Sequence, residues 1–181
     1  STVYNRSSGL TNSRLVKRPS LFYLVSEVKS SDVGTALHYL LEAASAFGDV
    51  PSYRYDVVDL TRQYLSDVFD EKQKELVDAY NSADKEEVKL LNSYLQKILV
   101  DMDQLLESNE YFLLGKWIQD AERWAESKEE TVLYRFNAIN QLTQWGPAHT
   151  VLNDYAGKQW SGMVGDYYLK RWELFADRIE W

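Results

Sequence analysis

Aromatic side chains gather in residues 141–172, and these are the residues whose types point most clearly to a chemistry. The rings there are Trp145, Tyr155, Trp160, Tyr167, Tyr168 and Trp172, and they lie within or after a single Trp-Gly-Pro break. Tyr and Trp each combine a flat apolar face with one hydrogen-bonding tip, which suits a surface with one wet side. Such rings can stack on the C–H face of a sugar. The alternative is an ordinary core of large side chains, which composition alone favours.

The break itself, Trp145-Gly146-Pro147, predicts a loop at the end of a helix. Gly and Pro stop the helix, and Pro biases the preceding residue towards an extended conformation. We therefore expect Trp145 at the rim of a rigid scaffold, where its ring could form one wall of a pocket. His149 lies in the same loop, and we expect an exposed bystander there. Asp154 is expected to open the next helix, as an N-cap or as a site residue.

Paired carboxylates would be the route to hydrolysis. A glycosidase needs two carboxyl groups roughly 5 to 10 Å apart across one bond. The aromatic segment holds Asp154, Asp166 and Glu173. Acids on helices usually face solvent, so no catalytic pair is expected within this chain. The sequence also contains no nucleophile elbow, phosphate loop or dinucleotide fingerprint.

Composition excludes several other classes of site and partner. The chain has no Cys and two distant His residues, so we predict no thiolate or His-rich metal site and no cofactor. Its net charge of −8 argues against a nucleic-acid partner, because phosphate contacts require a basic surface. No apolar run is long enough to predict a membrane span.

The rest of the sequence predicts an all-α fold, a bundle of about six or seven helices. Gly and Pro are few, and apolar residues recur at steps of three and four. Within 88–105 this spacing is regular enough to bury one seam against a partner helix. The expected helices cover about 32–47, 53–80, 88–105, 112–124, 129–142, 154–167 and 168–180.

Two further features concern contacts with neighbours. Residues 1–31 are rich in Ser, Asn and Thr, and the first twenty contain four basic residues and no acid. We interpret 1–31 as a connecting arm, either a solvated linker or a segment lying on an acidic neighbour, and 32–181 as the helical domain. Gly162 and Gly165 each cost about 1 kcal/mol against Ala within a helix, which predicts a tight contact with another helix or domain.

The chain resembles the C-terminal helical domain of α-N-acetylglucosaminidases, glycoside hydrolase family 89. The resemblance spans nearly the whole chain in order, and blocks of this length are specific. The matching residues are Arg18-Pro19-Ser20-Leu21, the run from Tyr53 to Gln63, Phe112 to Gly115, Trp117, Tyr134, Asn137, Gln141-Leu142-Thr143, Trp145-Gly146-Pro147, Leu152, Asp154-Tyr155-Ala156, Lys158-Gln159-Trp160, Gly162, Asp166-Tyr167-Tyr168 and Arg171-Trp172.

This resemblance implies a parent enzyme with a central (β/α)8-type barrel against which the helical domain packs. Such enzymes remove terminal α-linked N-acetylglucosamine with retention, using two Glu residues that belong to the barrel. Residues 1–31 would then connect to that upstream barrel, and this chain alone should be inactive. An extracytoplasmic location is the one the family implies.

The resemblance also implies roles for individual residues. Trp145 would line the sugar site, and Tyr155 would lie at it or just behind it. Trp160 and Trp172 are expected to pack on the barrel. Arg54, Asp56, Asp59 and Arg62 are expected to form a buried ionic network at that contact. The full set of residues expected to be structural or to lie at the domain interface is Arg54, Asp56, Asp59, Arg62, Asp154, Lys158, Trp160, Arg171 and Trp172.

Two other functions remain open from the residues alone. The aromatics could make the bundle a stand-alone carbohydrate-binding module. The regular seam within 88–105 could instead serve a protein-interaction scaffold. A seam that is fully buried inside the chain would count against the second.

Overall fold

The protein is all-α, as the sequence predicts. The computed structural model describes residues 13–22 and 29–180, and no strand occurs within those ranges. Two 3-10 turns, Arg14–Val16 and Glu110–Phe112, and one π-helical turn, Val164–Tyr168, accompany the α-helices. The α-helices are α1 Ser30–Glu42, α2 Ala44–Phe47, α3 Pro51–Asn81, α4 Lys85–Glu107, α5 Leu114–Glu122, α6 Lys128–Leu142 and α7 Leu169–Ile179. None of these helices combines the length and apolarity that a bilayer span requires.

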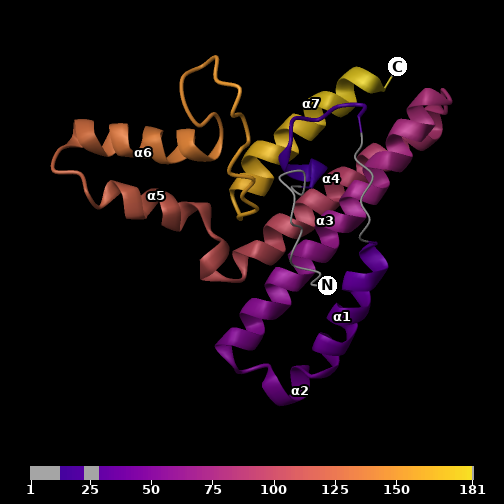
Figure 1. Cartoon of the computed structure of the whole chain (residues 1–181), viewed down its shortest axis with the longest axis horizontal. Coiled ribbons are helices and arrows are strands. Elements are labelled where there is room, and N and C mark those ends of the chain that lie inside the picture. Colours follow the sequence, from indigo (N-terminus) through magenta and orange to yellow (C-terminus); the bar gives the residue numbers. More distant parts are fainter. Residues whose placement is uncertain (1–12, 23–28, 181) are drawn as a thin grey trace.

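The core lies where α4 packs between α3 and α7 (Figure 1). Asp84 caps α4 by accepting a hydrogen bond from the Glu87 N–H at 3.1 Å. Acidic side chains in the first turn stabilise the helix further, because they lie at the positive end of its dipole. From that start most of the predicted seam is buried, with Val88, Leu91, Leu95, Ile98 and Met102 each at most 4% exposed; the last member, Leu105, is half-buried against the same core. The seam is therefore occupied by helices of the same chain.

The described part of the expected connecting arm, residues 13–22, belongs to this core. Leu15 and Val16 are fully buried. Ser13 caps the 3-10 turn and donates to the Asp70 carboxylate on α3 at 2.7 Å. These contacts tie the segment to α3, so this part is not a solvated linker. Most of the remaining expected arm, residues 1–12 and 23–28, lies outside the described ranges.

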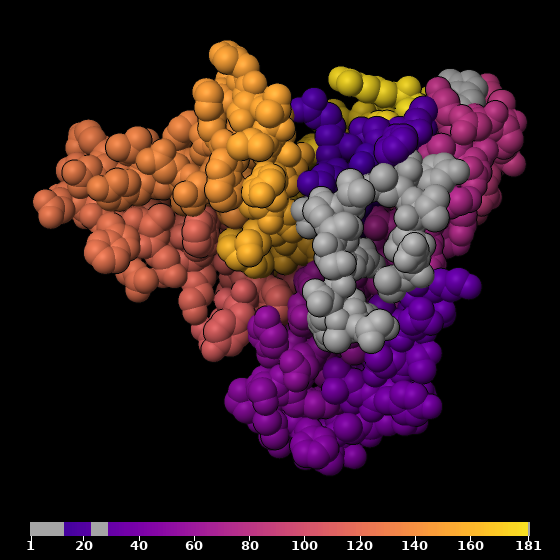
Figure 2. All heavy atoms as spheres, viewed as in Figure 1, coloured from indigo at the N-terminus to yellow at the C-terminus, as the bar shows by residue number. Residues whose placement is uncertain are grey.

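Helices α5 and α6 form a hairpin that projects from the bundle, which we call the α5–α6 arm (Figures 1 and 2). Ser127 caps α6 by accepting from the Glu130 N–H at 3.1 Å. The arm joins the bundle through an isolated β-bridge between Leu113 and Ser161, and the Trp117 and Trp160 rings lie 5.9 Å apart beside it. In Figure 2 the arm is a separate lobe beside the bundle.

The predicted helix over 154–167 is wrong. Residues 150–160 run as turns and irregular backbone, and helical structure resumes only at Met163. Asp154 has φ 59° and Gly162 has φ 85°, both left-handed conformations that interrupt a helix. From Val164 the π-helical turn runs directly into α7. This segment is therefore a long loop laid over the ends of α4 and α6.

The tight contact predicted at Gly162 and Gly165 lies within the chain. Asp103 on α4 accepts from the N–H groups of Gly162 and Gly165 at 2.9 and 2.8 Å. A Cβ added at Gly165 would lie 2.8 Å from an Asp103 carboxylate oxygen. The missing side chain at Gly165 thus lets the chain approach α4 closely enough for one carboxylate to accept from both amides, while Gly162 supplies the left-handed turn.

Candidate functional site

The Trp-Gly-Pro break forms a tight turn at the end of α6, as the sequence predicts for a helix-ending loop. The Trp145 N–H donates to the Asn140 carbonyl at 2.6 Å. The Asn140 side-chain amide donates to the Gly146 carbonyl at 3.0 Å and accepts from the Gly146 N–H at 2.8 Å. Trp145 has φ 52° and Gly146 has φ 142°. The turn is therefore held by one Asn and places Trp145 in a conformation that bulky residues seldom adopt.

Trp145 and Tyr155 face each other across this loop. Their ring centroids lie 5.7 Å apart with an interplanar angle of 71°, an edge-to-face pair. Trp145 is 44% exposed and Tyr155 is 64% exposed, so both rings lie on the surface. Two rings at nearly a right angle form what we call the aromatic corner, Trp145 with Tyr155. Edge-to-face packing stabilises such a pair without burying it.

Asp154, the residue before Tyr155, fixes the backbone on that side of the aromatic corner. Its N–H donates to the Thr143 carbonyl at 2.7 Å, which brings the far end of the loop back to α6. Its carboxylate accepts two hydrogen bonds from the Arg171 guanidinium, at 2.8 and 3.0 Å, and one from the Tyr167 hydroxyl at 3.2 Å. Asp154 is therefore no helix N-cap: it is 3% exposed and forms a bidentate ion pair with α7.

The tyrosines around this ion pair stay protonated. Burial raises the pKa of Tyr167 above its usual value, and the nearby Asp154 carboxylate acts in the same direction. Burial also raises the pKa of Tyr168. The Arg171 guanidinium lies 4.8 Å above the Tyr167 ring centroid, within the range of a cation–π contact. Each phenol can thus donate a hydrogen bond, and Arg171 is held on two sides.

Trp160 and Lys158 lie near the base of the α5–α6 arm. Trp160 is half-buried against Trp117, and the exposed Lys158 ammonium lies 5.4 Å from the Trp160 ring centroid. Trp172 is different: it is 2% exposed and its ring packs edge-on against Phe69 at 5.0 Å. The expectation that Trp172 packs on a neighbouring domain is wrong, because the bundle core already covers the ring.

The expected ionic network of four residues separates into two parts. Arg62 donates to Asp59 at 2.9 and 2.7 Å and to the Gln159 side chain at 2.6 Å, which ties α3 to the loop before the π-helical turn. Arg54 is exposed and pairs with Asp49 at 3.1 Å, while Asp56 is exposed on the same helix. Arg54 and Asp56 therefore form no buried network with the other two in this chain.

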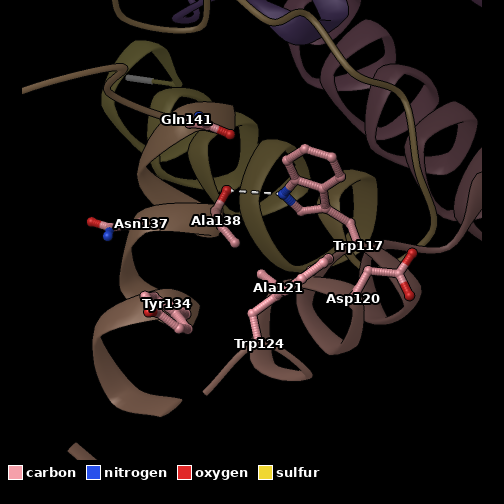
Figure 3. A pocket seen from close by; sticks show the side chains of 8 residues that line it. All are labelled: Trp117, Asp120, Ala121, Trp124, Tyr134, Asn137, Ala138 and Gln141. Atoms are coloured by element: carbon pink, nitrogen blue, oxygen red, sulfur yellow. Dashed lines mark hydrogen bonds between the residues drawn. The ribbon is translucent and has the colours of Figure 1, made fainter. Parts of the chain in front are cut away.

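A hollow in the α5–α6 arm went unpredicted (Figure 3). Its volume is about 470 Å³, and aromatic, amide and carboxylate side chains of both helices line it. The Trp117 indole N–H donates to the Ala138 carbonyl at 3.1 Å, the dashed line in Figure 3, which fixes that ring across the hairpin. The lining residues are Trp117, Asp120, Ala121, Trp124, Tyr134, Asn137, Ala138 and Gln141. Spacing of three and four along both helices could have indicated this shared face.

The arrangement favours binding over acid–base chemistry. Asp154 is committed to Arg171, Glu173 accepts from Lys170 at 3.0 Å, and Asp166 is exposed beside Gly165. Within the described ranges, no group of three or more His, Cys, Asp or Glu residues could hold a metal ion. What the loop presents is the aromatic corner, a rigid apolar surface with a phenol at its edge.

Comparisons with known proteins agree with the resemblance seen in the sequence. Residues 1–180 match the family described as alpha-N-acetylglucosaminidase (NAGLU) C-terminal domain. The human protein named alpha-N-acetylglucosaminidase is 39% identical over 184 aligned residues, which cover 98% of this chain and 25% of the human protein. The chain thus spans about a quarter of the length of that relative. It belongs to the family of alpha-N-acetylglucosaminidase C-terminal domains.

Proposed function

We propose that this chain is the helical accessory domain of an α-N-acetylglucosaminidase, and that its aromatic corner forms part of the pocket for terminal α-linked N-acetylglucosamine. The reacting groups, an acid/base and a nucleophile of a retaining glycosidase, belong to the remainder of the polypeptide. The observation that carries the proposal is the exposure of Trp145 and Tyr155 as a fixed edge-to-face pair. Bulky rings that serve only a core are buried, as Trp172 is.

The aromatic corner suits the proposed sugar. N-acetylglucosamine has an apolar C–H face on its ring and a methyl group on its acetamide. One ring of the corner can stack on the C–H face while the other covers an edge, because their planes differ by 71°. The Tyr155 phenol adds a hydrogen-bonding tip for a sugar hydroxyl. Both rings are neutral, which matches a neutral terminal sugar.

The α5–α6 arm supports the second part of the proposal, that the domain packs on a catalytic barrel. Four large apolar side chains there are more than half exposed: Trp124 at 79%, Val132 at 69%, Phe136 at 60% and Leu133 at 51%. Monomeric proteins seldom leave such groups of apolar side chains in water, and clusters of them mark interaction surfaces. We infer that the larger part of the parent polypeptide covers the exposed α6 side chains Val132, Leu133 and Phe136, and that the isolated chain self-associates through them, whereas Trp124 lines the hollow. The extracytoplasmic location implied by the family is part of the same proposal.

The protein-interaction alternative loses its main support. It rested on the regular apolar seam of α4, and that seam is buried against α3 and α7. A partner helix could bind there only if the bundle opened.

The test uses the full-length polypeptide that carries this chain and a chromogenic α-N-acetylglucosaminide. We expect Trp145→Ala to lower kcat/KM at least tenfold, equivalent to about 1.4 kcal/mol of lost transition-state binding, with the thermal unfolding midpoint little changed. The matched control is Tyr39→Ala, which removes a 66% exposed ring from α1, away from the aromatic corner. Unchanged kinetics in Trp145→Ala would remove the pocket-wall role. Hydrolysis by the isolated chain would contradict the placement of the reacting groups elsewhere.

A further inference from the structure

The aromatic corner depends on a backbone turn that is costly by itself. A non-Gly residue with positive φ is destabilised by roughly 1–2 kcal/mol and persists only where its surroundings enforce it. Trp145 has φ 52°, although nothing about an indole favours that conformation. Within the described part of the chain, the Trp145 indole N–H donates to no other residue, so the backbone conformation and the contact with Tyr155 are what the structure shows to direct the ring. Whatever enforces the turn therefore sets the direction of the ring.

Asn140 supplies that constraint. Its carbonyl accepts from the Trp145 N–H, and its side chain exchanges two hydrogen bonds with the backbone of Gly146. Three hydrogen bonds thus run from one residue of α6 to two consecutive residues of the turn. Asn140 is half-buried, and the next residue but one, Leu142, is 4% exposed and anchors the helix end in the core.

The reciprocal pair with Gly146 requires an amide. The side chain must present a donor and an acceptor side by side, at the reach of two carbons from the backbone. Asp has two acceptors and would place a charge against the Gly146 carbonyl. Gly146, at φ 142°, supplies a conformation that L residues seldom adopt. The chemistry of both partners is therefore restricted.

We propose that Asn140 is a positioning residue that acts on the sugar only through Trp145, by holding its backbone in the left-handed conformation. This inference rests on the proposed function, because it matters only if the Trp145 ring meets a substrate. Nothing in the sequence pattern indicated Asn140, which lies two residues before the end of α6 and five before Trp145.

The test is a double-mutant cycle in the full-length enzyme, with Asn140→Ala, Trp145→Ala and the double variant assayed for kcat/KM on a chromogenic α-N-acetylglucosaminide. We expect Asn140→Ala to lower kcat/KM about tenfold in the parent background, which corresponds to about 1.4 kcal/mol. In the Trp145→Ala background the same change should have almost no effect, since there is no ring left to position. A general structural role would lower activity by the same factor in both backgrounds.

Asn140→Asp provides a conservative variant and replaces Asn140→Ala in the cycle if the latter does not fold. It keeps the acceptor for the Gly146 N–H but sets a carboxylate oxygen against the Gly146 carbonyl, so it too should lower kcat/KM in the parent background and have almost no effect in the Trp145→Ala background. Equal losses in the two Trp145 backgrounds, or an Asn140 variant with unchanged kinetics beside an impaired Trp145→Ala, would overturn the positioning role alone. An unimpaired Trp145→Ala would instead overturn the proposed function.

Discussion

The bundle buries its large aromatic side chains, whereas the α5–α6 arm and the loop after it expose theirs. In the bundle, Trp172 and Tyr168 are at most 2% exposed and fill the space between α3, α4 and the π-helical turn. In the arm and the loop that follows it, Trp124, Trp145 and Tyr155 are between 44% and 79% exposed. The aromatic residues of this chain thus form two groups, one that fills the core and one that stays at the surface, and we propose that the second group meets the rest of the parent polypeptide and its sugar.

The two regions also differ in how their loops are held. Polar side chains bind the bundle together, as the half-buried Asp103 does with the amides of Gly162 and Gly165. The loop over 143–160 is held at its two ends, by Asn140 at the Trp145 turn and by Asp154 at Arg171. Between those points it carries exposed side chains such as Val151, at 93%. A surface fixed at its ends but open along its length is typical of a binding loop on a rigid scaffold.

The strongest way to test this contrast is to truncate one Trp from each region. Trp172→Ala removes a ring that contacts Phe69 and Phe175 and should lower the free energy of unfolding by about 3–5 kcal/mol. Trp124→Ala, the matched control at 79% exposure, should change it by less than about 0.5 kcal/mol. Urea unfolding of the 181-residue chain, followed by far-UV circular dichroism, measures both.

Similar losses for the two variants would show that the arm is part of the core after all. In the full-length protein the loss caused by Phe136→Ala should exceed its loss in the isolated chain if the rest of the polypeptide covers the exposed side of α6. That comparison between the chain and its parent tests the proposed interface without an activity assay.

A second contrast concerns ion pairs. Asp154→Asn keeps the shape and the left-handed preference of the residue but removes the charge that faces Arg171. We expect a loss of about 2–3 kcal/mol in the free energy of unfolding, because the guanidinium is left half-buried without its counter-charge. Asp120→Asn, which breaks the exposed pair with Arg123 on the arm, is the control and should cost less than about 1 kcal/mol. Chemical denaturation at neutral pH compares them, and an equally small effect at Asp154 would contradict its role as the anchor of the loop.

The sequence predicts the elements that local spacing determines. The seam of α4 and the helix-ending turn at Trp145-Gly146-Pro147 depend on residues within a few positions of one another, and both expectations agree with the structure. The expected helix over 154–167 fails because its outcome depends on distant partners. Asp154 binds Thr143 and Arg171, and Gly162 binds Asp103, contacts that no periodicity reveals.

The candidate site was predictable only in part for the same reason. Resemblance and the Gly-Pro break together indicate Trp145 as a rim residue, and its exposure agrees with that position. The resemblance implied one ionic network of four residues on α3, but a shared helix does not determine what lies opposite each residue. Arg62 meets Gln159 across the fold, whereas Arg54 reaches Asp49 in the turn before its own helix. Asn140 was missed because its partners are backbone groups.

A last pair of substitutions compares how tightly the backbone is packed within the bundle and within the arm. Gly165→Ala would place a Cβ 2.8 Å from the Asp103 carboxylate, and the carboxylate cannot withdraw without weakening its bonds to the Gly162 and Gly165 amides. We expect a loss of about 1–2 kcal/mol in the free energy of unfolding, larger than any gain from helix propensity. Gly115→Ala on the arm has no neighbour within 4 Å and should stabilise the chain by up to about 1 kcal/mol, since Ala favours the helix. Opposite signs in thermal or urea unfolding are therefore expected, and the same sign for both would mean that the bundle tolerates a methyl group at its closest approach as easily as the open arm does.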